Sequence, residues 1–190
     1  MKIGIDISQL AFSNTGVANY LGNLVESLIQ IDNKNQYILF YSSLRQSFRS
    51  SMLNTLSNPN VSIRKFKIPP TVLDFLWNKL HILPIENFIG DVDIFITSDW
   101  TEPPTKKAKK ATILYDLIVY KYPEESHNQT EFNPFGFIIS PNIVASQKRK
   151  LKWVKKESDK ILCISEATKK DAVEILGIDE TRLEVINAGI

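Results

Sequence analysis

The chain has 190 residues, a formal net charge of +2 and an apolar fraction of 43%. This length suits one domain with a core that needs no disulfides, and the ordinary apolar fraction without a polar low-complexity tract argues against wholesale disorder. The single cysteine, Cys163, lies in an apolar run, so a disulfide framework is excluded, which suits a reducing cytosol. No run resembles a signal peptide or a membrane span, and we expect a cytoplasmic protein.

Short apolar runs alternate along the chain with segments of helical periodicity. The expected strands cover 2–7, 37–41, 61–66, 92–97, 111–115, 160–164 and 182–186. The expected helices cover 16–31, 44–56, 71–80, 141–156 and 165–176, with a proline-rich loop over roughly 122–134. Apolar strands alternating with helices favour an α/β fold that is Rossmann-like and doubly wound, with a mostly parallel sheet and helices on both faces.

The first loop is a candidate phosphate-binding element. Asn14, Thr15, Gly16 and Val17 lead directly into a helix, where free backbone N–H groups and the positive dipole end favour an anion. The alternative is that Gly16 only permits a tight strand-to-helix turn. The three spaced glycines of a dinucleotide fingerprint are missing, which counts against an NAD enzyme.

Polar residues follow the later strands, at the edge of the sheet where ligands bind in open parallel sheets. Ser98 and Asp99 come after the fourth strand, with Trp100 beside them, and Asp116 comes after the fifth. The tryptophan suits either stacking on a sugar or half-buried packing. Asp116 either binds sugar hydroxyls or caps the next turn, and Ser165 is a favoured helix N-cap.

Other chemistries find less support in the sequence. No Cys or His spacing resembles a metal site, and no nucleophile elbow or Walker loop is present. A phospho-receiver built on Asp6 and Asp116 is a weaker alternative, because receivers are shorter and need an acidic cluster with a lysine. Asp6 otherwise ends the first strand and bonds to the backbone of the next loop.

The expected helix over 141–156 is strongly basic. Its cationic residues are Lys148, Arg149, Lys150, Lys152, Lys155 and Lys156, and a second cluster comprises Lys106, Lys107, Lys109 and Lys110. The basic helix is either a solvated face or a peripheral contact with the anionic inner face of a membrane. Nucleic acid is a less favoured partner, since no nucleic-acid-binding signature accompanies the charge.

Several segments together resemble the N-terminal domain of the family 4 retaining glycosyltransferases, of GT-B architecture. The resemblance is carried by residues 1–6, 15–20, 113–118 with 122–124, 164–171 and 185–190, in the order found in the family. It implies two Rossmann-like domains with the active site between them. Residues 1–186 would form the acceptor-side domain and 187–190 the start of a hinge to a donor domain absent from this sequence.

The resemblance implies transfer of a sugar, with retention, from a nucleotide-sugar donor to a glycan or lipid-linked acceptor, without a metal or other cofactor. Gly16 would let its loop approach the donor diphosphate. Tyr115 and Asp116 would line the sugar side of the cleft, where many members carry His-Asp, and Ser165 with Glu166 would form its wall. A tyrosine keeps hydrogen-bonding ability but cannot become a cation near neutral pH.

The second hypothesis is a non-catalytic α/β interaction or regulatory module. It predicts a stable domain that ignores sugar nucleotides and lipid-linked acceptors, whereas the first predicts a domain with little or no activity by itself that gains activity with a matching donor half.

Overall fold

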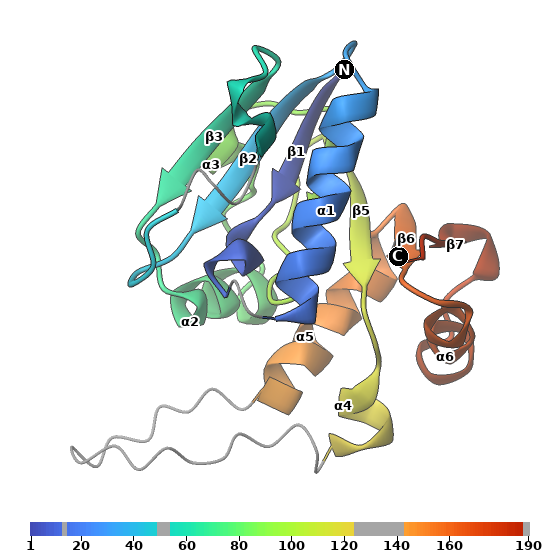
Figure 1. Ribbon diagram of the computed structural model, residues 1–190. Helices are drawn as coiled ribbons and strands as arrows, with labels where there is room; N and C mark the ends of the chain where they lie inside the picture. Colours follow the sequence, from blue (N-terminus) through green and yellow to red (C-terminus); the bar gives the residue numbers. More distant parts are fainter. Residues whose placement is uncertain (13–14, 49–53, 124–142, 188–190) are drawn as a thin grey trace.

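The computed structural model describes residues 1–12, 15–48, 54–123 and 143–187. Its centre is a seven-stranded sheet in the order β3-β2-β1-β4-β5-β6-β7, in which every neighbouring pair is parallel (Figure 1). The strands are β1 (Lys2–Asp6), β2 (Gln36–Ser42), β3 (Val61–Phe66), β4 (Ile94–Thr97), β5 (Lys109–Leu114), β6 (Lys160–Cys163) and β7 (Leu183–Val185). The predicted Rossmann-like α/β fold is confirmed.

Helices lie on both faces of the sheet (Figure 1). One face carries η1 (Ser8–Ala11), α1 (Gly16–Ile31) and η3 (Asn54–Ser57). The opposite face carries α2 (Pro70–Leu73), the π-helix η4 (Asp74–Lys79), α3 (Glu86–Ile89), α5 (Ile143–Glu157) and α6 (Glu166–Leu176). The short helices α4 (Ile118–Lys121) and η6 (Glu180–Arg182) lie in connections.

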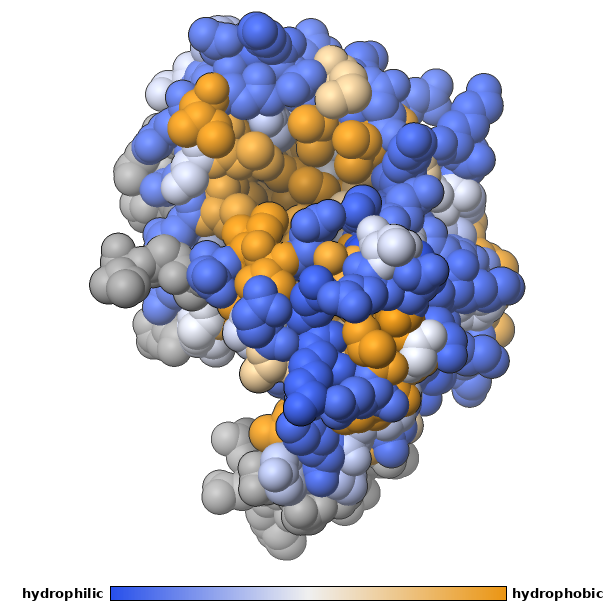
Figure 2. All heavy atoms as spheres, turned by 90° about the vertical axis from the view of Figure 1, so that its right-hand side faces the viewer, coloured by the Kyte–Doolittle hydropathy of each residue, from blue (hydrophilic) through white to orange (hydrophobic). Residues whose placement is uncertain are grey.

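The helix α1 packs through one apolar stripe. Its buried residues Leu21, Val25 and Ile29 recur every four positions and contact the sheet through Ile5 and Leu39. This period places them on one side of the helix, so their burial fixes α1 against the sheet. Figure 2 views the molecule from the β7 side, and there apolar side chains gather in a hollow bordered by polar ones.

The opposite face has two apolar clusters. Beneath α2, η4 and α3, the ring of Trp77 packs against Phe40, at 5.6 Å between centroids, and Phe95 completes the cluster. Beneath α5 and α6, Val154 and Ile161 are fully buried. Because aromatic and branched side chains bury the most apolar area, these clusters supply much of the stability of this layer.

A buried polar network ties α5 to the sheet. The Lys110 ammonium lies 3.1 Å from Glu102 and 3.1 Å from Glu157, and the imidazole of His81 lies 2.9 Å from Glu157. The Glu102 carboxylate also accepts a hydrogen bond from Thr97, at 2.7 Å. Buried charges persist only when they are paired in this way, so the network fixes the position of α5 over β4 and β5.

Several predicted boundaries differ from the structure. The helix expected over 44–56 is wrong in its described parts, since residues 43–48 form no helix and only η3 follows the undescribed residues 49–53. The Tyr41 hydroxyl donates to the Gln46 carbonyl at 3.0 Å and so occupies an acceptor that a helix would use for its own backbone bonding. The short helices α3 and α4 were not predicted, and the predicted loop lies outside the described residues except for Tyr122 and Pro123.

The strand order reverses between β1 and β4, which are neighbours although two strands separate them in sequence. The carboxyl ends of these strands, at Asp6 and Thr97, therefore mark the topological switch point where open α/β sheets bind ligands. Within the described part of the chain, no helix is long and apolar enough to cross a bilayer.

Candidate functional site

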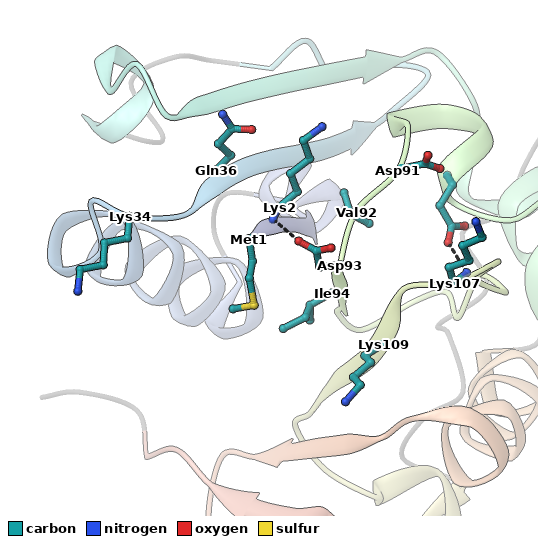
Figure 3. A pocket seen from close by; sticks show the side chains of 11 residues that line it. Met1, Lys2, Lys34, Gln36, Asp91, Val92, Asp93, Ile94, Lys107 and Lys109 are labelled. Atoms are coloured by element: carbon teal, nitrogen blue, oxygen red, sulfur yellow. Dashed lines mark hydrogen bonds between the residues drawn. The ribbon is translucent and has the colours of Figure 1, made fainter.

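Two large hollows lie at opposite ends of the strands. One is at the amino ends of the strands, called here the amino edge, and the other is at their carboxyl ends, called the carboxyl edge. The hollow at the amino edge has a volume of about 980 Å³ and is lined by Lys2, Lys34, Asp91, Asp93 and Lys109, among others. Figure 3 shows these side chains spread around its rim, with Asp93 bonded to the backbone N–H of Lys2. Exposed side chains of both signs that do not converge on one point make a poor catalytic site.

The hollow at the carboxyl edge has a volume of about 850 Å³ and lies beside the switch point. Its lining combines apolar side chains with polar ones: Phe12, Leu44, Pro69, Pro70, Trp100 and Ile143 with Ser43, Arg45, Gln46, Thr71, Asp74, Thr101 and Ser146. An apolar wall with a few polar groups is typical of small-molecule sites, so this hollow is the candidate site.

Asp6 stands at the end of β1, in a small pit lined also by Trp100 and Thr101, which line the larger hollow too. Its carboxylate accepts a hydrogen bond from the Ser8 amide at 2.9 Å, as the sequence suggested. Burial raises the pKa of the Asp6 carboxyl above its ordinary value, and the Ser8 contact and Lys150 oppose this rise. The sequence left Asp6 outside the site, and the structure adds it.

Lys150 is the main correction to the predicted basic surface. It is only 2% exposed, and its ammonium donates to the carbonyl oxygen of Ser98 beneath the switch point. Burial lowers the pKa of Lys150, while the carboxylates of Glu102, Asp99 and Asp6 favour its charged form. The signal was available in the sequence, since position 150 continues the stripe of Ser146 and Val154, which are both buried on α5.

Asp99 faces α5 at the end of β4. The side chain of Gln147 donates to its carbonyl oxygen at 3.0 Å. Burial raises the pKa of the Asp99 carboxyl, Lys150 lowers it, and the charge of Asp116 raises it. The structure thus brings Asp6, Asp99 and Lys150 into one electrostatic cluster, of which the sequence identified only Asp99.

Ser98 and Tyr115 are in contact, as expected for neighbours at this edge. Their side-chain oxygens lie 3.3 Å apart, and the Tyr115 ring meets the ring of Tyr20 edge-on at 5.7 Å. Burial raises the pKa of the Tyr115 hydroxyl, so it stays neutral at physiological pH and serves as a hydrogen-bonding group. Tyr20 was not predicted as a site residue, and its hydroxyl donates to the Ile186 carbonyl at 2.9 Å.

Asp116 and Ser165 have local structural partners. The exposed Asp116 accepts a hydrogen bond from the amide of Ile118 at 3.0 Å, so it caps the turn that starts α4. Ser165 caps α6 by accepting a hydrogen bond from the backbone amide of Thr168. The side-chain hydroxyl of Thr168 donates to the carbonyl oxygen of Tyr115 at 3.0 Å. Glu166 is exposed in the first turn of α6. Thr168 therefore links the α6 terminus to Tyr115 and the cluster around it.

The phosphate-loop residues begin α1 on the same edge. Thr15 caps the helix by accepting from the Ala18 amide at 3.2 Å, and Asn14 lies outside the described residues. A Cβ built on Gly16 meets no atom within 4 Å, so a side chain would fit at this position. Val17 is half-buried against the core beneath α1. The structure therefore does not require a glycine at position 16.

Among the described residues, no cluster of three His, Cys, Asp or Glu side chains is arranged to hold a metal ion. Comparison of the chain with protein-family models and with curated proteins finds no match. The interpretation of this site therefore depends on its geometry and on the motifs of the sequence.

Proposed function

We propose that this chain is the acceptor-side domain of a retaining glycosyltransferase, which uses a nucleotide-sugar donor and a glycan or lipid-linked acceptor. The observation that carries the proposal is the convergence of Asp6, Ser98, Asp99 and Tyr115 at the switch point, beside a hollow of about 850 Å³. A polar cluster beside an apolar wall with Trp100 suits an acceptor sugar carried on an apolar tail.

The proposed chemistry needs no metal or other cofactor. The backbone amides at the start of α1, at Gly16 and Val17, would stabilise the negative charge of the departing diphosphate. The neutral Tyr115 hydroxyl would donate to or accept from a sugar hydroxyl, a role that needs no positive charge. The donor domain that completes the site is implied by the resemblance and is part of the proposal.

Binding of an acceptor probe tests this assignment on the chain as it is. In saturation-transfer NMR, a short-chain prenyl diphosphate bearing one sugar should receive signal from the wild-type protein. Trp100→Ala should weaken binding by about tenfold, the loss of roughly 1.4 kcal/mol. Lys109→Ala, at the opposite edge, is the matched control. A probe that does not bind, or that binds equally to both variants, contradicts the proposal.

A non-catalytic interaction module is the second candidate. It is favoured by the fact that Ser98, Tyr115, Asp116 and Ser165 already have protein partners. Such a module would bind neither the prenyl probe nor a panel of sugar nucleotides, and co-expression with a matching donor half would produce no transfer.

A peripheral contact with an anionic bilayer belongs to the proposal in a corrected form. Lys148, Lys152 and Lys155 are exposed on α5, whereas Arg149 forms an ion pair with Asp74 at 2.8 Å. The imidazole of His81 stacks on Trp153 of α5, at 3.6 Å between ring centroids, so the segment around His81 lies beside this helix. That segment carries the exposed apolar side chains of Phe75, Leu80, Ile82 and Leu83.

Apolar side chains beside lysines are typical of surfaces that lie on anionic membranes. Vesicles with and without anionic lipid should distinguish this surface, and Lys152→Glu with Lys155→Glu should reduce sedimentation with the anionic vesicles. Lys170→Glu, on the exposed side of α6, is the control. Equal sedimentation of all variants would remove the membrane from the proposal.

A further inference from the structure

A small pit adjoins the carboxyl-edge hollow and is called here the Asp6 pit. It has a volume of about 30 Å³ and shares Phe12, Trp100 and Thr101 with the hollow, among others. Since a site for one water molecule takes about 10–15 Å³, the pit admits roughly two heavy atoms of a ligand. Asp6 ends β1, so the pit lies at the switch point of the sheet.

Three polar side chains that line the Asp6 pit are almost completely buried. Asp6 is 6% exposed, Gln9 is 5% exposed and Thr101 is 3% exposed. None of the hydrogen bonds among the described residues uses the side-chain amide of Gln9 or the hydroxyl of Thr101. The Asp6 carboxylate accepts from the Ser8 amide through one of its oxygens, and a carboxylate can accept further hydrogen bonds.

Neighbouring hydroxyl groups in the pit already have protein partners. The Ser8 hydroxyl accepts a hydrogen bond from the Ser42 amide at 3.0 Å. The Ser42 hydroxyl donates to the carbonyl oxygen of Ile68 at 2.9 Å. The fold therefore satisfies these serines by itself, and the polar groups of Gln9 and Thr101 are left for a ligand.

A buried polar group without a partner is costly for the folded state. Replacing Gln9 or Thr101 by an apolar residue of similar shape would remove that cost. An amide and a hydroxyl kept in this state beside a carboxylate point to a ligand that completes their hydrogen bonds.

The charges around the pit favour a neutral ligand. Lys150 is 2% exposed and opposes the charge of Asp6, and Glu102 is the other charged group that acts on Asp6. Lys150 would repel an ammonium group of a ligand, and Asp6 would repel an anion. A hydroxyl is neutral and both donates and accepts, so one hydroxyl can donate to Asp6 and accept from the Gln9 amide.

We propose that the Asp6 pit binds the hydroxymethyl group of the acceptor sugar, whose hydroxyl donates to Asp6 and accepts from Gln9 or Thr101. This inference rests on the proposed function and deepens it, because it identifies the acceptor sugar as a hexose with a free primary hydroxyl. A hydroxymethyl group has two heavy atoms, the size that the pit admits. Trp100 lines both the pit and the hollow, so the sugar ring would lie against the indole while the apolar tail follows the hollow.

Paired acceptor probes test the pit. Each pair consists of two short-chain prenyl diphosphates, one bearing a hexose and one bearing the matching 6-deoxyhexose, in the gluco, galacto and manno configurations. In saturation-transfer NMR titrations of the wild-type chain, the hexose of at least one pair should bind about tenfold more tightly, because the 6-deoxy form leaves Asp6 and Gln9 unpaired. A 6-amino form should bind less tightly than the hexose, since Lys150 opposes its charge.

Two isosteric variants report on the pit itself. Gln9→Met breaks no hydrogen bond among the described residues, so it should fold, and it should bind the hexose and the 6-deoxy probe within about twofold of each other. Thr101→Val should also reduce the preference for the hexose. Gln36→Met, the same substitution at an exposed position of the amino edge, is the matched control and should keep the wild-type preference.

The outcomes separate this inference from the proposed function. If no probe binds, the proposed function fails, and the inference that rests on it fails too. If both members of every pair bind the wild type equally, the acceptor site stands, but the pit holds only water and the inference is overturned. It is also overturned if the 6-amino form binds most tightly, or if the hexose preference is unchanged in both Gln9→Met and Thr101→Val.

Discussion

The ammonium of Lys150 donates to the carbonyl oxygen of Ser98, so a cation from the middle of α5 lies directly beneath the carboxyl end of β4. Asp6 and Asp99 act electrostatically on the same ammonium. The switch point of the sheet is therefore built around a buried charge that comes from a helix, and the loops that carry Ser98 and Asp99 depend on that helix for their position.

We expect Lys150→Met to be one of the most destabilising substitutions on α5. Removing one partner of a buried charge cluster leaves the others unpaired, at a cost of about 3–5 kcal/mol. Lys152→Met, on the exposed side of the same helix, should change the free energy of unfolding by no more than about 0.5 kcal/mol. Urea unfolding of the two variants measures this difference.

The double variant Lys150→Met with Asp99→Asn separates the charge effect from lost packing. If the charges matter, the second change should recover part of the loss, because it removes a carboxylate that no longer has its cation. Equal stability of the Lys150→Met and Lys152→Met variants would show that the buried cation has no such role.

The difference between the predicted and the observed site has a simple physical origin. The loops after the strands were predictable, because apolar runs followed by polar residues identify strand ends, and Ser98, Asp99 and Tyr115 do lie together. Lys150 was predicted on the surface because lysine is rarely buried. The period of α5 does put position 150 on the buried stripe with Ser146 and Val154, but its partners Ser98 and Asp6 are distant in sequence, so the local pattern does not identify them.

The same limit applies to the fold. The strands were predicted well where they are apolar and buried, as in β2 and β6, and the parallel pairing of the strands follows from their alternation with helices. The residues after β2 contain apolar and helix-forming side chains, yet residues 43–48 form no helix, and the Tyr41 hydroxyl occupies the Gln46 carbonyl that a helix would use for its own bonding. Such tertiary and side-chain contacts override propensity.

The pair of Asp32 and Tyr37 should make stability depend on pH in acid. The hydrogen bond from the Tyr37 hydroxyl, at 2.6 Å, lowers the pKa of Asp32 below its ordinary value of 3.8, with help from Asn35 and Lys34. A lowered folded-state pKa stabilises the fold above the unfolded value, and this contribution is lost as the pH falls below about 3.8. Tyr37→Phe should therefore lower the free energy of unfolding at pH 7, by an amount that shrinks on acidification.

Urea titrations at a series of pH values from neutral down to about pH 3 measure the effect on both proteins. Tyr120→Phe is the control, since none of the described hydrogen bonds uses that hydroxyl. A constant difference between the wild type and Tyr37→Phe at every pH would show that the hydrogen bond does not act on the ionised form of Asp32.

Cys163 should resist thiol reagents in the folded protein. It is fully buried in β6, and burial raises the pKa of its thiol to about 11. Since the thiolate is the reactive form, labelling at pH 8 should be slow and should proceed mainly through unfolding. Labelling with a chromogenic disulfide in increasing urea should follow the unfolding curve, and rapid labelling without urea would contradict the burial.

Two glycines should respond very differently to alanine. A Cβ on Gly4 would lie 2.8 Å from the side chains of both Ile89 and Phe95, so Gly4→Ala should cost about 1–3 kcal/mol through overpacking. A Cβ on Gly16 meets nothing within 4 Å, and Gly16→Ala should leave the free energy of unfolding within about 0.5 kcal/mol of the wild type.

Because Gly16→Ala should leave the fold intact, it isolates the role of this loop in binding. If the α1 terminus approaches the donor diphosphate, the added methyl group should weaken the binding of a sugar nucleotide to the assembled enzyme by about tenfold. Isothermal titration of the wild type and Gly16→Ala measures this change. Unchanged affinity in a stably folded Gly16→Ala variant would remove the phosphate-binding role from this helix terminus and leave the cluster around Asp99 and Tyr115 as the site.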